Sequence, residues 1–308
     1  MVVQGEMYEV RVPATTANLG PGFDSFGLAL SLYLRIRFKL ADKNKINLVD
    51  EHLEHLPASK DNLIYRSIEY LYERVGKPVP ALELEVKSDI PLARGLGSSG
   101  SAIVGGLYIA NLLLDEPFSR EQLFQCAVEL EGHSDNVGAS MFGGFVVTTC
   151  DGVKDAEVVK LPFPEQLKVV LLIPDDRLST KAARGLIPER LPLADVSYNI
   201  GHASLMLAYL MTGEVDKLNI AMRDRVHQPY RAKGVKGLMR ALELAEASGR
   251  FSAALSGAGP TLLFFATEEH LAEVYTVVER IMAEEKITGQ VLTVSHADNG
   301  VELVRELS

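Results

Sequence analysis

The stretch Pro91-Leu-Ala-Arg-Gly-Leu-Gly-Ser-Ser-Gly-Ser101 is the most informative part of the sequence. It opens a run of twenty residues, Gly95–Leu114, that carries no charged side chain. A glycine-rich loop that leads into a buried helix presents free backbone N–H groups at the positive end of the helix dipole, and therefore predicts an anion site. The hydroxyl groups of Ser98 and Ser99 can meet phosphate oxygens or a hydrated Mg²⁺. The alternative is a helix start that is rich in glycine only because it packs tightly.

Other interpretations of this stretch fit less well. Gly95–Gly100 matches G-x-G-x-x-G, but Ser88–Arg94 separates it from the preceding strand and no βαβ unit surrounds it, so a dinucleotide fold is not expected. No Gly-Lys-Ser/Thr follows, which excludes a Walker A loop. A membrane-spanning helix needs about 20 mostly apolar residues, whereas the first half of this run is largely Gly and Ser.

Composition narrows the class of protein. The 308 residues are 47% hydrophobic and 23% charged, which is typical of a soluble globular protein with one large or two ordinary domains. The net charge of −10 argues against nucleic acid as a partner. Cys126 and Cys150 show no metal-binding spacing, so neither a disulfide scaffold nor a structural zinc site is expected. Residues 1–13 are charged where a secretion signal needs an apolar core, so we expect a cytoplasmic protein without a membrane segment.

Periodicity predicts an α+β protein in two domains. Leu28–Leu40 alternates large apolar residues with smaller or polar ones, the pattern of a long strand with one buried face. Asp151–Pro164 mixes charge, glycine and proline, so the boundary is placed there, giving domains 1–155 and 156–308. Further strands are expected at Met7–Val12, Leu82–Lys87, Phe145–Cys150, Lys168–Ile173, Thr261–Ala266 and Gln290–Ser295, and helices at Asp61–Val75 (N-cap Asp61), Ser119–Glu131 (a capping box), Ser197–Met211, Val215–Val226, Val235–Ser248 and Glu268–Lys286.

Other polar loops accompany the glycine-rich one. Pro13-Ala-Thr-Thr-Ala-Asn-Leu-Gly-Pro-Gly-Phe-Asp24 is either an elaborate hairpin or a loop whose polar groups face inward. Ser256-Gly-Ala-Gly-Pro260 lets the backbone approach another loop or a ligand phosphate closely. Glu131-Gly-His-Ser-Asp-Asn136 gathers two carboxylates, an imidazole and an amide. Arginines end two further polar turns, Ser179-Thr-Lys-Ala-Ala-Arg184 and His227-Gln-Pro-Tyr-Arg231.

In this order, the motifs resemble those of the GHMP kinases over nearly the whole chain. The last two turns resemble the branch that phosphorylates L-homoserine, and differ from the sugar and mevalonate kinases. The resemblance implies the GHMP kinase fold, with an N-terminal ribosomal-protein-S5-like domain, a C-terminal ferredoxin-like domain and the active site between them. It also implies transfer of phosphate from Mg²⁺·ATP to the side-chain hydroxyl of L-homoserine, on the way to threonine, by a homodimer.

The resemblance also implies the substrate contacts, and the residue types agree with the chemistry. Homoserine is a zwitterion, so its carboxylate needs a cation and its ammonium an anion. Arg184 and Arg231 suit the carboxylate, because guanidinium binds it bidentately. Asp24, helped by Asn18, suits the ammonium, and the resemblance places His133 in the same pocket.

For ATP, the resemblance assigns the glycine-rich loop, with every residue from Pro91 to Ser101 at the triphosphate: Pro91, Leu92, Ala93, Arg94, Gly95, Leu96, Gly97, Ser98, Ser99, Gly100 and Ser101. It puts Asn62 near the adenine, and Lys87 beside it. Ser98 and Glu131 are the expected Mg²⁺ ligands, with Glu129 as the alternative if the helix phase differs by two residues.

The reacting end is assigned to Asp135, Asn136 and Thr180. Asp135 is the best candidate for a general base, although a loose, metaphosphate-like transition state can proceed without a strong one. Two features depart from the family pattern: Gly100 replaces the usual alanine, and Ser134 and Ala139 replace prolines, which predicts a less rigid loop. The competing hypotheses are another small-molecule kinase of the superfamily, such as a mevalonate-type kinase, and a non-catalytic nucleotide-binding member.

Overall fold

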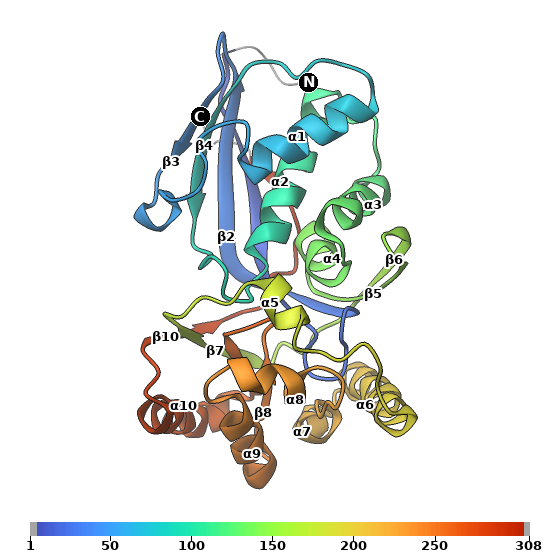
Figure 1. Cartoon of the computed structure of the whole chain (residues 1–308), viewed down its shortest axis with the longest axis vertical. Coiled ribbons are helices and arrows are strands. Elements are labelled where there is room, and N and C mark those ends of the chain that lie inside the picture. The colour runs from blue at the N-terminus through green and yellow to red at the C-terminus, as the bar shows by residue number, and fades with distance from the viewer. Residues whose placement is uncertain (1–4, 305–308) are drawn as a thin grey trace.

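The computed structural model describes residues 5–304. Its elements form two layers stacked along the long axis of the molecule, and each layer consists of one β-sheet together with its own helices (Figure 1). The centre of the first layer is the antiparallel pair β1 (Tyr8–Ala17) and β2 (Phe26–Leu40). The long strand predicted over Leu28–Leu40 is confirmed. Most of its apolar side chains are buried, and Leu30 and Ile36 are fully so, which is the reason for the alternation.

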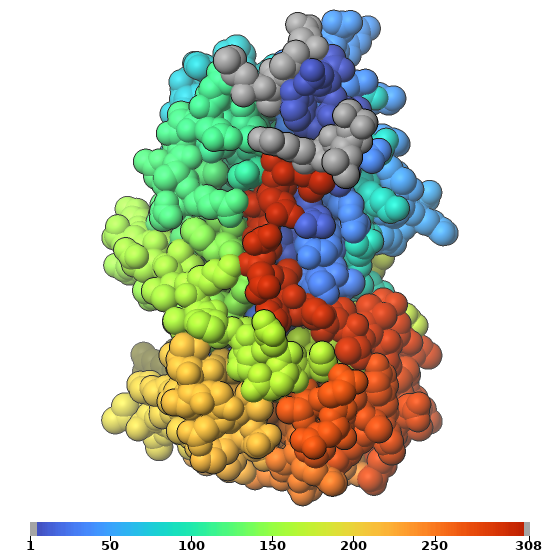
Figure 2. Space-filling view, turned by 180° about the vertical axis from the view of Figure 1, so that it is seen from behind, coloured from blue at the N-terminus to red at the C-terminus, as the bar shows by residue number. Residues whose placement is uncertain are grey.

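Seven strands within residues 5–304 form one sheet. Its order is β11-β1-β2-β4-β3, while β5 pairs with another part of β2 and β6 lies outside β5. These further strands are β3 (Lys45–Leu48), β4 (Leu82–Ser88), β5 (Phe145–Asp151), β6 (Lys154–Leu161) and β11 (Glu302–Val304). Figure 2 shows the end of the chain, in red, running from the second layer up over the first. There β11 pairs with β1, and Arg11 Nε donates to Glu302 at 3.0 Å.

Helices α1 (Leu63–Arg74), α2 (Ser98–Leu113), α3 (Arg120–Glu131) and α4 (Asp135–Phe142) cover this sheet (Figure 1). Helix α2 contacts α1, α3, α4 and β1, which explains why it carries no charge. The capping box at Ser119 is confirmed. The N-cap predicted at Asp61 is wrong: Asn62 caps α1, since its side-chain oxygen accepts from the backbone N–H of Ile64 at 3.0 Å.

The second layer contains a four-stranded antiparallel sheet of order β10-β7-β9-β8 within the described residues. Its strands are β7 (Lys168–Pro174), β8 (Ser252–Leu255), β9 (Leu262–Ala266) and β10 (Gly289–Val294). Its helices are α5 (Thr180–Arg184), α6 (Leu193–Thr212), α7 (Leu218–Ala221), α8 (Gln228–Arg231), α9 (Leu238–Ser248) and α10 (Leu271–Glu285). In the part of the chain that the structure describes, no helix has the length and apolar character that a membrane crossing requires.

Side-chain alternation on β7 joins the two layers. Val170 and Leu172 belong to the cluster that packs against α9 and α10, whereas Val169 and Leu171 belong to the large core of the first layer. Successive strand residues point to opposite faces, so the four-stranded sheet is buried on both sides. The second layer is therefore fixed against the first, with the glycine-bearing loops between them.

Several sequence expectations differ from the structure. The predicted boundary between residues 155 and 156 falls inside β6, so the seven-stranded sheet contains residues from both sides of it. The strand expected at Met7–Val12 continues to Ala17, which makes the first part of the Pro13–Asp24 loop a strand. The helix predicted over Val215–Val226 is shorter than expected: a 3₁₀ turn over Val215–Lys217 runs into α7, which ends at Ala221.

Candidate active site

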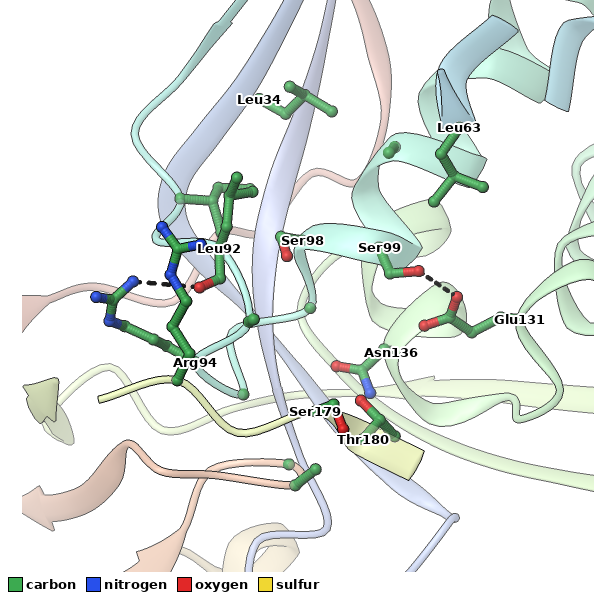
Figure 3. A pocket seen from close by; sticks show the side chains of 18 of the residues that line it. Leu34, Leu63, Leu92, Arg94, Ser98, Ser99, Glu131, Asn136, Ser179 and Thr180 are labelled. Carbon is green, nitrogen blue, oxygen red and sulfur yellow. Dashed lines mark hydrogen bonds between the residues drawn. The ribbon is translucent and has the colours of Figure 1, made fainter. Parts of the chain in front are cut away.

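A cavity of about 500 Å³ lies between the two layers. The start of α2, the start of α4, the loop before β2 and the segment around α5 all contribute to its wall. Figure 3 shows Ser98 and Ser99 at the first turn of α2, with Asn136 and Thr180 close by. The motifs that are far apart in the sequence are thus brought to one cleft.

The glycine-rich loop is fixed by close backbone contacts. Ala93, Gly95 and Gly97 have positive φ angles of 55°, 74° and 68°. A Cβ on Gly95 would lie 2.2 Å from the carbonyl oxygen of Ser256, so this position needs glycine. The loop around Ser256 therefore packs directly behind the loop that starts α2, and the first-turn N–H groups of α2, which have no partners within the helix, are left at the cleft.

The predicted nucleotide-binding residues divide into two groups. Those that line the cavity are Asn62, Leu92, Ala93, Arg94, Gly95, Gly97, Ser98 and Ser99. Those that do not are Lys87, Pro91, Leu96, Gly100 and Ser101.

The packing of β4 and of the start of α2 explains why residues of the second group do not line the cavity. Val86 and Ser88 of β4 line the cavity, so Lys87 between them points to the opposite face of the sheet and is exposed. Leu96 is buried in the core, and the hydroxyl of Ser101 donates to the carbonyl oxygens of Pro13 and Gly97. The structure therefore does not bring Lys87 to the cleft.

Arg94 has a structural role. Its guanidinium donates to the carbonyl oxygens of Pro174, Leu92 and Asp175 at 2.7, 3.2 and 2.8 Å. These bonds attach the glycine-rich loop to the second layer. Arg177 and His55 also line the cavity, with Arg177 Nη1 lying 3.1 Å from His55 Nε2. Both belong to polar segments that carry no recognisable motif, so the sequence did not predict them.

Glu131, and not Glu129, faces the cleft. Glu129 lies between α1 and α3, where it accepts hydrogen bonds from Tyr70 and Arg74. Glu131 Oε2 accepts a 2.7 Å hydrogen bond from the hydroxyl of Ser99, as Figure 3 shows. Burial raises the pKa of Glu131, opposed by the nearby charge of His133. The hydroxyl of Ser99 therefore bonds to Glu131, while Ser98, the serine expected to bind Mg²⁺ with Glu131, lines the same cavity.

A carboxylate–imidazole–carboxylate arrangement lies beside it. His133 Nδ1 is 2.7 Å from Asp135 Oδ1, and His133 Nε2 is 3.7 Å from Glu131 Oε1. Burial lowers the pKa of His133, but the hydrogen bond to Asp135 and the two carboxylate charges outweigh it and raise the pKa to about 9. His133 is therefore an imidazolium at neutral pH.

Asp135 is held as a carboxylate. Its Oδ1 also accepts from the backbone N–H and the side-chain amide of Asn136, at 2.7 and 3.2 Å. Burial opposes ionisation, but His133 and these donors lower the pKa of Asp135 overall. Ser134, which stands where the family has a proline, is buried, and its hydroxyl lies 2.8 Å from that of Thr148.

The predicted carboxylate and ammonium contacts meet each other in the structure. Arg184 makes a bidentate ion pair with Asp24, with N–O distances of 2.9 and 2.8 Å. Asp24 has a positive φ of 55°, and its backbone N–H donates to Asn18 Oδ1 at 2.9 Å. Thr180, the first residue of α5, lines the same region. Each member of the pair is partly exposed, so a charged ligand can compete for both.

Arg231 is different, because it is buried. Its side chain lines the cavity, yet the residue is only 2% exposed. Its guanidinium donates to the carbonyl oxygen of Gly257 at 3.0 Å and to that of Ala183 at 3.4 Å. Within residues 5–304 no carboxylate lies within ion-pair distance of it, and burial lowers its pKa. A buried guanidinium without a carboxylate partner is costly unless a ligand supplies one.

Both sequence domains of one kinase superfamily match this chain. Residues 62–144 match the GHMP kinases N terminal domain, and residues 206–284 match the GHMP kinases C terminal domain. With the fold and cleft described above, these matches make the chain a GHMP kinase, which is an ATP-dependent kinase acting on an alcohol.

Comparison with individual relatives identifies the family within the GHMP kinases. The chain is 38% identical over 301 residues to the homoserine kinase of Microchaete diplosiphon, covering 96% of this chain and 97% of the relative. It is 40% identical over 286 residues to that of Deinococcus radiodurans, covering 92% and 93%. The crystal structure of homoserine kinase from Cytophaga hutchinsonii matches with a TM-score of 0.86, 26% identity and 99% coverage of both chains. The chain therefore belongs to the homoserine kinase family, and the expected fold is confirmed.

Proposed function

We propose that this chain transfers the γ-phosphoryl group of Mg²⁺·ATP to the side-chain hydroxyl of L-homoserine, giving O-phospho-L-homoserine, and that it acts as a cytoplasmic homodimer. The observation that best supports this choice of substrate is the buried guanidinium of Arg231, which lines the cleft without a carboxylate partner among the described residues. The acceptor alcohol must therefore carry a carboxylate.

The neighbouring ion pair supports a zwitterionic acceptor. Arg184 and Asp24 satisfy one another in a partly exposed position, where an ion pair contributes only about 0–1 kcal/mol. An amino acid can replace both partners at once, its carboxylate binding Arg184 and Arg231 and its ammonium binding Asp24. An uncharged alcohol would leave Arg231 unpaired, and this penalty supplies the discrimination.

The start of α2 is suited to the triphosphate. Its first-turn N–H groups and the helix dipole favour negative charge, and the cavity continues toward Asn62 and apolar side chains such as Leu34 and Leu63 (Figure 3), which suit the adenine.

The donor set fits Mg²⁺ only together with phosphate oxygens. Within residues 5–304 no cluster of three or more His, Cys, Asp or Glu side chains could hold a metal ion by itself. Glu131 is a largely buried carboxylate at the cleft, and the Ser98 hydroxyl lines it too. Mg²⁺ commonly binds through one or two carboxylates plus substrate phosphates, so Glu131 and Ser98 would hold it. When bound, Mg²⁺ neutralises charge on the phosphate oxygens.

Asp135 would orient the acceptor hydroxyl. Its Oδ1 receives donors from His133 and Asn136, and no donor to Oδ2 is present among the described residues. Oδ2 is thus available to accept the hydroxyl of the substrate. Because the pKa of Asp135 is lowered, it is a weak base, which is sufficient for a loose transition state that makes little demand on the nucleophile. Thr180, which lines the same cavity, would contact the reacting end.

A coupled ADP-release assay with Mg²⁺·ATP tests the proposal. L-homoserine is compared with mevalonate, galactose, L-serine and L-threonine at equal concentrations. We expect turnover with homoserine well above that with the others. Preferred turnover of galactose, which has no carboxylate, would overturn the assignment of Arg231 to a carboxylate. Preferred turnover of mevalonate, which has a carboxylate but no ammonium, would overturn the assignment of Asp24 to an ammonium. Both outcomes would leave the nucleotide site intact. ATP binding without turnover of any alcohol would indicate a non-catalytic member.

A further inference from the structure

An aromatic ring lies next to both arginines of the candidate substrate site. The centre of the Phe23 ring is 5.4 Å from the guanidinium carbon of Arg184 and 5.3 Å from that of Arg231. The same ring stacks on the imidazole of His227, with centroids 5.3 Å apart and an interplanar angle of 26°. Phe23 directly precedes Asp24, the carboxylate that pairs with Arg184.

The two arginines need such a neighbour. Their charges repel each other, and this repulsion adds to burial in lowering the pKa of Arg231. Within residues 5–304, Asp24 forms an ion pair with Arg184 and acts on Arg231 only through its more distant charge, which raises the pKa of Arg231 but does not outweigh burial. The face of an aromatic ring carries negative partial charge and attracts a cation within about 6 Å of its centre. Phe23 therefore offers both guanidinium groups a favourable contact that does not compete for the carboxylate of a substrate.

The position of the ring is fixed by its loop. The backbone N–H groups of Gly22 and Phe26 donate to the carbonyl oxygens of Asn18 and Gly22 at 3.0 and 2.9 Å, which closes the turn around Phe23. His227 Nε2 lies 2.8 Å from the carbonyl oxygen of Gly20. Since a carbonyl only accepts, Nε2 carries the proton, and the imidazole joins this loop to α8, which ends at Arg231.

We propose that Phe23 is a positioning residue that holds Arg184 and Arg231 at the spacing needed to receive the carboxylate of the acceptor, and that it contributes in this way to selecting amino-acid alcohols. The inference rests on the proposed function. It goes beyond it by assigning part of the carboxylate specificity to an apolar side chain that makes no polar contact with the substrate.

The test compares Phe23→Leu, which keeps an apolar side chain without a ring, with Phe23→Tyr, which keeps the ring. For Phe23→Leu we expect KM for L-homoserine to rise roughly 3- to 30-fold, the range that corresponds to lost cation–π contacts. The KM for ATP should stay within twofold. Phe23→Tyr should restore KM for homoserine to within about threefold of the original protein. Thermal melting of each variant with and without ATP shows whether the fold and the nucleotide site are intact.

A substrate analogue separates positioning from general damage. 3-Aminopropan-1-ol is homoserine without its carboxylate, and its inhibition constant against homoserine can be measured in each variant. Phe23→Leu should change this constant by less than twofold, because the analogue does not use the arginines. An equal loss for homoserine and the analogue, a matching rise in KM for ATP, or unchanged homoserine kinetics in Phe23→Leu would overturn the inference alone. Absence of homoserine turnover in the unmodified protein would overturn the proposed function and this inference with it.

Discussion

Replacing Arg231 with lysine tests the buried carboxylate site most directly. Lysine keeps the positive charge but loses the planar fork that binds a carboxylate through two N–H groups. Hydrogen bonds to charged groups contribute about 1.5–3 kcal/mol each. Arg231 is only 2% exposed, so water cannot replace the lost bond. We therefore expect KM for L-homoserine to rise roughly 10- to 150-fold.

The matched control is Arg184→Lys. The side chain of Arg184 is 45% exposed and already paired with Asp24, so its loss should raise KM by no more than about fivefold. Both variants are assayed by ADP release at saturating Mg²⁺·ATP, with KM for ATP as an internal reference. A larger effect of Arg184→Lys than of Arg231→Lys would refute the reasoning from burial. An unchanged KM in a folded Arg231→Lys protein would refute the carboxylate assignment itself.

Three further predictions concern the rest of the cleft. Glu131→Gln should lower kcat on the order of 100-fold or more and raise the Mg²⁺ concentration needed for half-maximal rate. The control is Glu129→Gln, because the carboxylate of Glu129 is bound to Tyr70 and Arg74; this variant should leave the Mg²⁺ requirement unchanged. Equal effects of the two variants would contradict the choice of Glu131. Folding raises the pKa of His133 from 6.5 to about 9. The imidazolium therefore stabilises the fold below pH 6.5 by up to about 3 kcal/mol, and this contribution is lost as the pH rises through 9. The melting temperatures of the original protein and of His133→Gln should converge over that range, and a constant difference between them would count against the charged state of His133. Gly95→Ala would place a Cβ 2.2 Å from the carbonyl oxygen of Ser256, so KM for ATP should rise. Unaltered ATP kinetics would show that this contact can relax.

The strands that the sequence predicts well are those buried on one face. The alternation over Leu28–Leu40 predicts β2 because most of its apolar side chains are buried in the core; Leu32 and Leu40 are half-buried. The first strand is harder, since Thr15 and Thr16 are polar but fully buried. Their hydroxyls bond to Asn136 and Ser256, contacts over more than a hundred residues that no local pattern carries. An edge strand such as β6 is largely exposed, and its charged sequence therefore resembles a linker.

The sequence predicts which residues reach the candidate site better than it predicts which of their side chains bond to each other there. Asp24, Arg184 and Arg231 do meet at one cleft, as the complementary charges of a zwitterion suggest. The sequence could not indicate that Asp24 and Arg184 pair with each other in the absence of substrate. It also could not indicate that the hydroxyl of Ser99, next to the expected Mg²⁺ ligand Ser98, bonds to Glu131, because that depends on the rotation of α2 relative to α3. The prediction that Lys87 contacts the nucleotide is not supported by the structure, for a related reason. Side chains alternate between the two faces of β4, and Lys87 lies on the face away from the cavity.

The pairing of β11 with β1 has a consequence for synthesis on the ribosome. Arg11 and Glu302, which bond across these strands, are 291 residues apart in the chain. A nascent chain that has completed β2, β4 and the helices α1 to α4 still exposes the outer edge of β1, with its unpaired backbone groups. Such edges are templates for pairing with other chains. The first half of the molecule thus remains open to wrong strand addition until translation has passed residue 304, and a ribosome that stalls within the second layer would release a polypeptide prone to aggregate.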